Sequence, residues 1–179
     1  MIHPILLYGD KLLEQKSGNI PSDMPKGKLE ELVNDLFETM HKANGVGISA
    51  IQIGIPFRIF VVEAHLEEED FHFRGIFINP RIINEWGPMV KFPEGCLSVP
   101  QLTAYVERRE NIELEYYDID FNKHTEIFNG YKARIIQHEY DHLEGSIFVE
   151  KADNLWQKAL ERPLELIKER KIEVPYLSK

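Results

Sequence analysis

One stretch of the chain determines which element lies at the centre of the fold: Tyr131-Lys-Ala-Arg-Ile-Ile-Gln-His-Glu-Tyr-Asp-His-Leu143. Its apolar residues fall on more than one side of a helix, and Gly145 follows as a stop signal. A helix that is apolar on most sides is buried, and the polar residues that it carries must find partners inside the protein. The sequence therefore predicts a buried helix over residues 131–143.

This helix contains an H-E-x-x-H pattern, His138-Glu-Tyr-Asp-His142. Residues four apart share a helix face, with Cβ atoms about 5–6 Å apart, so the two imidazoles can bind one metal ion. A metal ion lowers the pKa of a coordinated water toward about 7, and Glu139 can accept and later donate the proton. The pattern indicates a mononuclear metallohydrolase.

A catalytic metal site needs a third protein ligand and one open position. No histidine follows His142, so the extended metzincin pattern is absent. Carboxylate candidates follow the motif, namely Glu144, Glu150 and Glu161. The competing candidate is Cys96, in a stretch between Pro93 and Pro100 that is too irregular for an ordinary core strand. Spacing alone does not choose between thiolate and carboxylate.

The remaining elements follow from hydrophobic periodicity. Residues 28–44 carry one apolar stripe at helical spacing and are followed by Gly45, and a last helix begins at about Asp153, where Pro163 should kink or divide it. Strands are expected at residues 58–63, 75–79, 81–86, 111–117 and 125–128, with a loop at residues 67–70 and a turn at residues 121–124. The predicted fold is α+β, with short, mostly antiparallel strands around the buried metal-binding helix, an N-terminal helix and a C-terminal helix.

Length and composition allow one domain with a sizeable core. The chain has 179 residues, of which 43% are hydrophobic, and no repeat or low-complexity tract. We expect a single domain over residues 1–179, with residues 153–179 as a C-terminal helical appendage. The one cysteine, Cys96, cannot form an internal disulfide, so nothing points to an oxidising compartment.

Charge and hydropathy limit the possible partners. The net charge is −9 and the isoelectric point is about 5.3, which disfavours direct nucleic-acid specificity. No apolar run reaches the roughly 18 residues of a membrane span, and no basic region precedes the first apolar run. We therefore expect no membrane partner and a location in the bacterial cytoplasm, although an organelle form that has lost its transit peptide would look the same.

Three segments together resemble the polypeptide deformylase family. They are Gly45-Val-Gly-Ile-Ser-Ala-Ile-Gln52, Glu94-Gly-Cys-Leu-Ser98 and Gln137-His-Glu-Tyr-Asp-His-Leu-Glu-Gly145. They correspond, in this order, to the family patterns G-x-G-x-A-A-x-Q, E-G-C-L-S and Q-H-E-x-D-H-L-x-G. Any one segment could mislead, but three in order and at comparable separations are very specific, and the similarity covers nearly the whole chain.

The resemblance implies the metal site. It implies that Cys96, His138 and His142 hold one divalent metal ion, typically Fe(II), with Zn, Ni or Co able to occupy the same site. It also implies that Glu94 pairs with Arg108 behind the site and fixes the loop of Cys96.

The resemblance also implies the reaction, which removes the formyl group from the N-terminal formyl-methionine of newly made polypeptides and releases formate. In this reaction Glu139 transfers the proton, while the side-chain amide of Gln52 and the backbone N–H of Leu97 stabilise the oxyanion. The implied partners are formyl-methionyl nascent peptides, and a transient association with the ribosome is compatible with this function.

The same resemblance indicates where the substrate binds. The peptide adds as an extended strand beside Val46, Gly47 and Gly95, where a Cβ at either glycine could obstruct its approach. Ile48 and Ile135, which lie next to the motifs, are candidates for the walls of the methionine pocket, and both could equally belong to the core.

The chain departs from the family pattern at three positions, and two other functions remain open. Ser49 replaces a frequent alanine, and its hydroxyl needs a partner if it is buried. Ile51 replaces a frequent proline or threonine, and Thr103 stands where some members have an arginine that contacts the distal peptide. The alternatives are a small H-E-x-x-H metalloprotease and a non-enzymatic structural metal site, which would tolerate the loss of Glu139.

Overall fold

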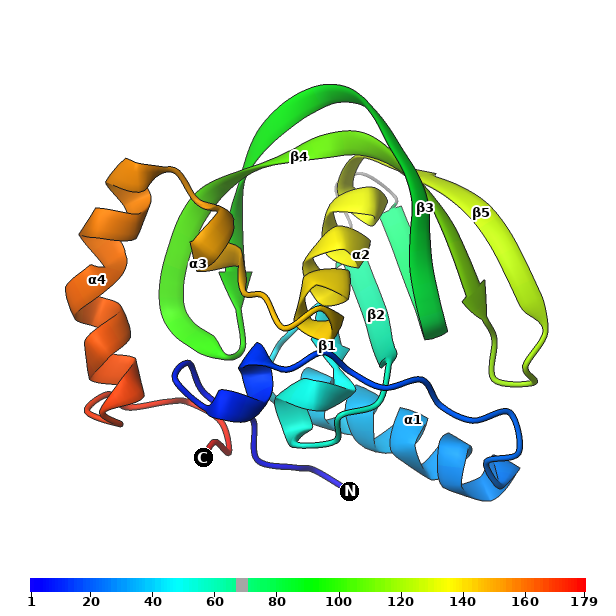
Figure 1. The fold of residues 1–179 in the computed structure, drawn as a ribbon. Coiled ribbons are helices and arrows are strands. Elements are labelled where there is room, and N and C mark those ends of the chain that lie inside the picture. Colours follow the sequence, from blue (N-terminus) through cyan, green and yellow to red (C-terminus); the bar gives the residue numbers. More distant parts are fainter. Residues whose placement is uncertain (67–70) are drawn as a thin grey trace.

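The computed structural model describes residues 1–66 and 71–179, and it contains one curved antiparallel sheet around a central helix (Figure 1). The strands follow the sheet in chain order and are β1 (Gly47–Ser49), β2 (Ile59–Leu66), β3 (Phe71–Cys96), β4 (Val99–Tyr117) and β5 (Lys123–Asn129). Every neighbouring pair is antiparallel. The predicted α+β class is confirmed.

Two strands are much longer than the short strands that we expected. β3 has 26 residues and β4 has 19, and β3 includes the strands predicted at residues 75–79 and 81–86. The sequence signals for a break, Pro80 and the pair Gly87 and Pro88, fall at register shifts of the β3–β4 ladder instead of at strand ends. Such bulges bend a strand without ending it, which is why β3 and β4 arch over the central helix.

The segment of Cys96 is also more regular than expected. Cys96 is the last residue of β3 and pairs with Val99 of β4 across a tight turn. The stretch is nevertheless no ordinary core strand, because Pro93 and Gly95 are exposed, a register shift falls between Gly95 and Cys96, and residues 97–98 form the turn. The loop predicted at residues 67–70 lies outside the described residues.

The helices largely agree with the periodicity. α1 (Lys26–Lys42) begins two residues before the predicted helix and ends at the cap residue Ala43, and Asn44 takes a left-handed φ of 55° there in place of Gly45. α2 (Gly130–Leu143) confirms the predicted buried helix, and Gly145 has a φ of 76°.

The C-terminal part of the chain contains two further helices, α3 (Phe148–Lys151) and α4 (Asn154–Lys168). Asp153 caps α4 by accepting from the backbone N–H groups of Leu155 and Trp156, as predicted. Of the two outcomes predicted for Pro163, a kink or a division of the helix, the division does not occur, since α4 continues through it. The buried face of Leu160, Leu164 and Ile167 packs in the same core cluster as β4, and this packing offsets the hydrogen bond that proline removes.

The turn before β5 also differs slightly from prediction. It lies at residues 118–122, with Phe121 in a left-handed conformation, and β5 begins two residues before the predicted strand. The alternation predicted for residues 111–117 is confirmed, because Ile112 and Leu114 are fully buried and face the central helix.

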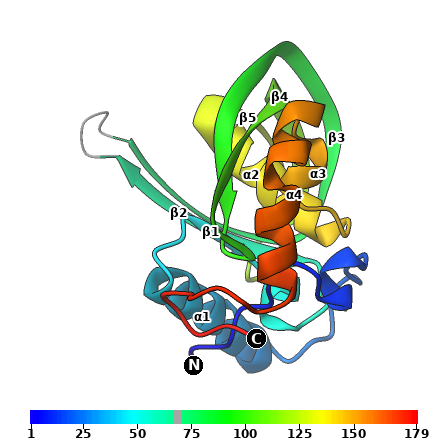
Figure 2. The same cartoon turned by 90° about the vertical axis from the view of Figure 1, so that its left-hand side faces the viewer.

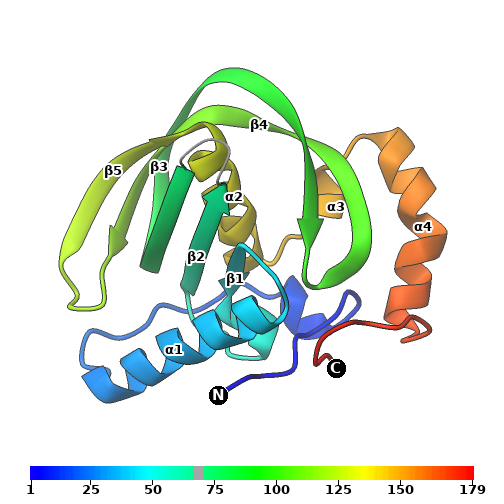
Figure 3. The same cartoon turned by 180° about the vertical axis from the view of Figure 1, so that it is seen from behind.

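Three apolar clusters hold these elements together. One joins α1 to β1 and β2, a second joins α2 to the concave face of β2–β5, and a third joins α3, α4 and residues 6–13 to the β3–β4 hairpin. Seen from behind, α1 lies below β1 and β2 (Figure 3), and the side view shows α4 against the outside of the hairpin (Figure 2). Within the described ranges, no helix is long and apolar enough to cross a membrane.

Candidate active site

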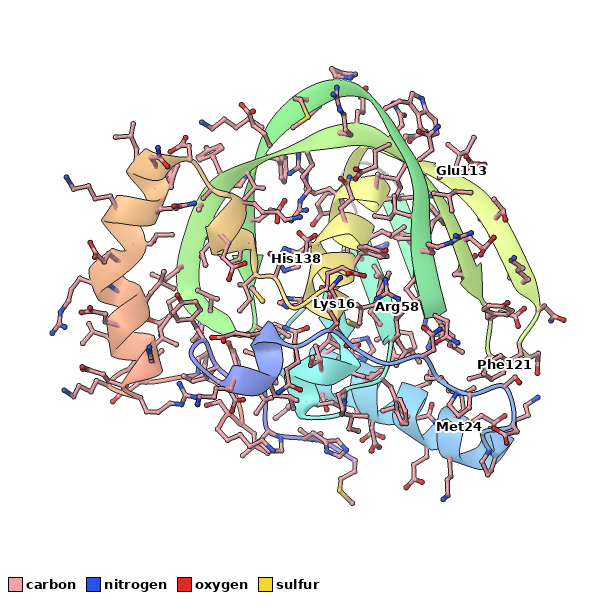
Figure 4. The ribbon with its side chains drawn as sticks, in the orientation of Figure 1. Lys16, Met24, Arg58, Glu113, Phe121 and His138 are labelled. Atoms are coloured by element: carbon pink, nitrogen blue, oxygen red, sulfur yellow. The ribbon has the colours of Figure 1, made fainter. Side chains whose placement is uncertain are left out.

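Two histidines of α2 and the cysteine at the end of β3 converge at one point. The ligand atoms of Cys96, His138 and His142 all lie within 4.8 Å of one another, and Cys96 Sγ is 3.2 Å from His142 Nε2. The two imidazole rings are nearly perpendicular, with centroids 5.2 Å apart. His138 projects from α2 toward the side on which β4 and α3 lie (Figure 4). These three side chains could hold one metal ion.

The three glutamates that the sequence offered as ligands lie elsewhere. Glu144 pairs with Lys16 at 3.0 Å and with Arg58 at 2.6 Å, near the carboxyl end of α2 (Figure 4). Glu150 accepts from Ser146 at the start of α3. Glu161 is exposed on α4. None of the three is part of the Cys–His–His group.

The orientation of His138 is fixed from behind. Its Nδ1 lies 2.9 Å from Glu94 Oε2, which leaves Nε2 facing the ligand group. Arg108 donates two hydrogen bonds to Glu94, at 2.6 and 2.8 Å, and both side chains are almost completely buried. The expected pair of Glu94 and Arg108 is confirmed, and it is a buried ion pair.

Two more charged side chains join this network. Arg134 donates to Glu94 Oε1 at 2.8 Å, and Asp141 accepts from Arg108 at 2.7 Å. Neither was predicted as a site residue, although Arg134 lies one turn before His138 on α2 and the sequence showed it on a buried helix. Burial by itself would raise the pKa of Glu94, but Arg108 and His138 outweigh it and hold that pKa far below its usual range.

Cys96 and the two histidines shift one another's pKa values. Burial by itself would raise the pKa of the Cys96 thiol, but His142 and His138 outweigh it and lower that pKa. Burial acts to lower the pKa of His142, yet the sulfur of Cys96 raises it. A thiolate with two imidazoles is a donor set that zinc, iron and related divalent ions accept, so these residues fit a metal ion.

Glu139 lies beside this group on α2 and is buried, with an exposed fraction of 4%. Burial raises the pKa of its carboxyl group above the usual value, which moves it toward the range of a proton-transfer group. The Ser49 hydroxyl lies 2.9 Å from Glu139 Oε2 and 3.0 Å from the Glu139 carbonyl. The partner that a buried serine needs at this position is therefore Glu139.

Gln52 reaches the group from the short 3₁₀ helix at residues 50–53. Its Nε2 lies 3.1 Å from Ser98 Oγ and 3.5 Å from Cys96 Sγ, and its Oε1 accepts from the Ser49 N–H at 2.8 Å. The side-chain amide is therefore oriented, with its N–H₂ end toward the turn that contains Leu97.

A cavity of about 460 Å³ opens onto these groups. Of the residues expected to contact substrate, Val46, Gly47, Gly95 and Ile135 line it. Ile48 does not line it, because its side chain is fully buried in the apolar cluster beneath, which includes α1. Three aromatic residues that the sequence did not single out also line the cavity: Phe92, Tyr131 and Tyr176.

β1 is the edge strand of the sheet beside this cavity. Its other side pairs with β2, where Gly47 lies opposite Val62, and the Val46 carbonyl accepts from Glu63. An edge strand offers backbone groups to a second extended chain. The cavity can therefore take an extended peptide whose reacting end reaches the metal-ligand group.

Comparison with known proteins agrees with this arrangement. A family model described as polypeptide deformylase matches residues 2–158. The peptide deformylase of Christiangramia forsetii is 43% identical, over 98% of this chain and 94% of that protein. The peptide deformylase of Cytophaga hutchinsonii is 39% identical, over 100% and 97%.

Solved structures agree as well. Peptide deformylase from Plasmodium falciparum superposes with a TM-score of 0.84 at 34% identity, covering 93% of this chain and 95% of that one. The Met-Ala-Ser-bound class I type b enzyme from Acinetobacter baumannii superposes with a TM-score of 0.80 at 31% identity, covering 84% and 98%. The fold and the site thus define a hydrolase of protein biosynthesis. The chain belongs to the polypeptide deformylase family, whose activity is the deformylation of nascent peptides.

Proposed function

We propose that the chain hydrolyses the formyl amide of N-terminal formyl-methionine on newly made polypeptides, releasing formate, with one divalent metal ion held by Cys96, His138 and His142. The observation that carries this proposal is the convergence of one sulfur and two imidazoles with a buried carboxylate and an oriented amide on one cavity. The family supports the same reaction.

The proposed metal is Fe(II), with Zn, Ni or Co as replacements. A bound ion would supply Lewis-acid polarisation of the formyl carbonyl and would make water a better nucleophile. Glu94 supports metal binding by His138 because it accepts from Nδ1 of that residue, as carboxylates do behind metal-binding histidines.

We assign proton transfer to Glu139. Its carboxyl group is buried beside the ligands and its pKa is raised, so it can take the proton of the attacking water and give it to the departing amine. We assign oxyanion stabilisation to the Gln52 side-chain amide and the Leu97 backbone N–H. Gln52 Nε2 lies near Cys96 Sγ, and Leu97 follows Cys96 directly in the turn.

The substrate is proposed to add as a strand at the free edge of β1, along Val46 and Gly47, with Gly95 on the opposite side of the cavity. Its methionine side chain would contact Ile135, which lines the cavity together with Phe92 and Tyr131. The A. baumannii relative binds Met-Ala-Ser, which is the product class that this reaction leaves. We propose a bacterial cytoplasm as the site of action, since nascent formylated chains are made there.

The test is formate release from a formyl-Met-Ala-Ser peptide by protein loaded with metal under anaerobic conditions. We expect formate and the free tripeptide, and no cleavage of an internal peptide bond in an unformylated peptide. Cleavage of internal bonds without formate release would support a metalloprotease instead.

The matched variant is Glu139→Ala, which should keep one metal ion per chain but lose turnover. Turnover that persists in this variant would overturn the role of Glu139. Metal binding without turnover in the unmodified chain would support a structural site.

A further inference from the structure

The peptide group that joins Leu97 to Ser98 is held at both ends. Its N–H, from Ser98, donates to Cys96 Sγ at 3.4 Å. Its carbonyl, from Leu97, accepts a hydrogen bond of 2.5 Å from the hydroxyl of Tyr176, which lies 79 residues further along the chain. Tyr176, Leu97 and Cys96 also line the same cavity.

The segment that carries Tyr176 is anchored independently of this contact. Leu177 accepts from the Ile5 N–H at 2.9 Å, and the Lys179 N–H donates to the Ile5 carbonyl at 3.0 Å. Gln101 Nε2 donates to the Glu173 carbonyl at 2.9 Å. The C-terminal segment therefore runs beside the N-terminal one, below α4 (Figures 1 and 2), and these contacts place the tyrosine at the turn.

The N-terminal segment in turn contacts the same site. The Tyr8 N–H donates to the Ser98 carbonyl at 2.8 Å, and the Leu6 N–H donates to the Gln52 carbonyl at 2.7 Å. Both ends of the chain thus fix the backbone around the Cys96 turn and the Gln52 helix.

The direction of the hydrogen bonds gives this contact a chemical consequence. Burial, and then the charge on Cys96, raise the pKa of Tyr176, so its hydroxyl is a neutral donor. A donor at the carbonyl of a peptide group polarises its N–H, because hydrogen bonds in a chain strengthen one another. The Ser98 N–H then donates more strongly to the sulfur, and such bonds tune the electron density of a metal-bound thiolate.

We propose that Tyr176 is a positioning residue for the reaction: through the Leu97–Ser98 peptide group it sets the orientation of the turn and the donor strength of the Cys96 thiolate. This inference rests on the proposed function in one respect, namely that Cys96 binds the metal. The C-terminal segment is accordingly part of the active site, although it carries no group that contacts the reacting atoms.

The test compares the full-length chain with Tyr176→Phe, which removes only the hydroxyl, both loaded with Co(II). Without the hydroxyl the Ser98 N–H donates less strongly, so the thiolate becomes more electron-rich and the thiolate-to-cobalt charge-transfer band moves to longer wavelength. We also expect kcat to fall by about 3- to 10-fold with KM nearly unchanged, less than the loss of 10-fold or more that follows removal of a direct partner of a metal ligand.

The matched control is Tyr105→Phe, an exposed tyrosine of β4 whose ring packs against Trp156 and which does not line the cavity. It should leave the band, kcat and KM unchanged. A band in Tyr176→Phe that coincides with that of the unmodified chain, at equal thermal stability, overturns the inference. If the unmodified chain itself shows no thiolate-to-cobalt band, then the proposed ligand set fails instead.

Discussion

Gly47 of β1 lies directly against the side chain of Glu139 on α2: a Cβ built on Gly47 would stand 2.5 Å from Glu139 Oε1 and 2.9 Å from its Cδ. The sequence suggested that this glycine leaves room for the approaching substrate. The structure gives a reason within the protein itself, since the edge strand and the central helix can approach this closely only without a side chain. A Cβ on Gly95, by contrast, would make only ordinary contacts, the nearest at 3.5 Å.

We expect Gly47→Ala to reduce kcat by roughly 100-fold. The new methyl group would overlap the Glu139 carboxylate, which must therefore move away from its position beside the metal ligands. Steady-state kinetics on the formylated peptide measure this loss, and metal analysis should still find the ion. Gly27→Ala, in the first turn of α1 with nothing within 4 Å of the new Cβ, is the control and should be fully active. Normal kcat in Gly47→Ala would mean that Glu139 has more freedom than this packing allows.

Ser49→Ala removes the hydroxyl that contacts Glu139. The unfolding free energy should fall by about 1–3 kcal/mol, because a buried carboxylate loses a hydrogen-bond partner. The activity should fall mainly in kcat, since the substrate cavity is unchanged. Urea unfolding and kinetics on the same preparation measure both quantities, and equal stability of variant and unmodified chain would contradict this role of Ser49.

Arg108→Met breaks the buried network behind the metal ligands. Glu94 and Asp141 would both lose a charged partner in a dry environment, so we expect a loss of about 3–5 kcal/mol. Arg162→Ala, which removes an exposed pair with Glu165, should change stability by less than about 1 kcal/mol. Chemical unfolding of both variants provides the comparison, and similar effects in the two would refute the structural importance of the buried network.

The turn between β4 and β5 should respond to acid through Asp118. Its carboxylate accepts from His124 and from the backbone N–H groups of Asp120 and Asn122. These contacts, the one from His124 most strongly, hold its pKa below the usual 3.8. Since the pKa is lowered on folding, the carboxylate stabilises the fold above pH 3.8, and this contribution is lost as the pH falls through and below that value.

Asp118→Asn isolates this contribution. Above pH 3.8 the variant should be less stable than the unmodified chain, and this difference should close as the pH falls through and below that value. Unfolding curves recorded at a series of pH values on metal-free protein test it. A difference that widened toward acid would mean that folding does not lower the pKa of Asp118.

Removal of the metal should destabilise the protein. An ion that binds only the folded chain adds about 2.7 kcal/mol of stability when its free concentration is 100 times its Kd. We therefore expect a chelator to lower the melting temperature of the unmodified chain and to have little effect on Cys96→Ala. Equal sensitivity of the two proteins would remove Cys96 from the ligand set.

Much of the fold follows from local patterns. Several features are specified by residues that lie close together in the sequence. They are the apolar stripe of α1, the apolar residues on most sides of α2, the alternation of residues 111–117 and the Asp153 cap of α4. Strand lengths are less predictable, because Pro80, Gly87 and Pro88 are breaks in most contexts. In this protein the long β3–β4 ladder absorbs them as bulges.

The sequence by itself determined the pair of histidines and the adjacent glutamate on one helix face, because residues four apart in a helix must lie together. It also determined the family, through three motifs in order. Those motifs also indicated Cys96 as the third ligand. Tertiary structure alone decided which side chains the motifs meet, namely Ser49 and Gly47 against Glu139, and Tyr176 at the turn of Leu97. The physical reason is that periodicity specifies which face of an element is buried, whereas the partner of that face depends on how distant segments pack.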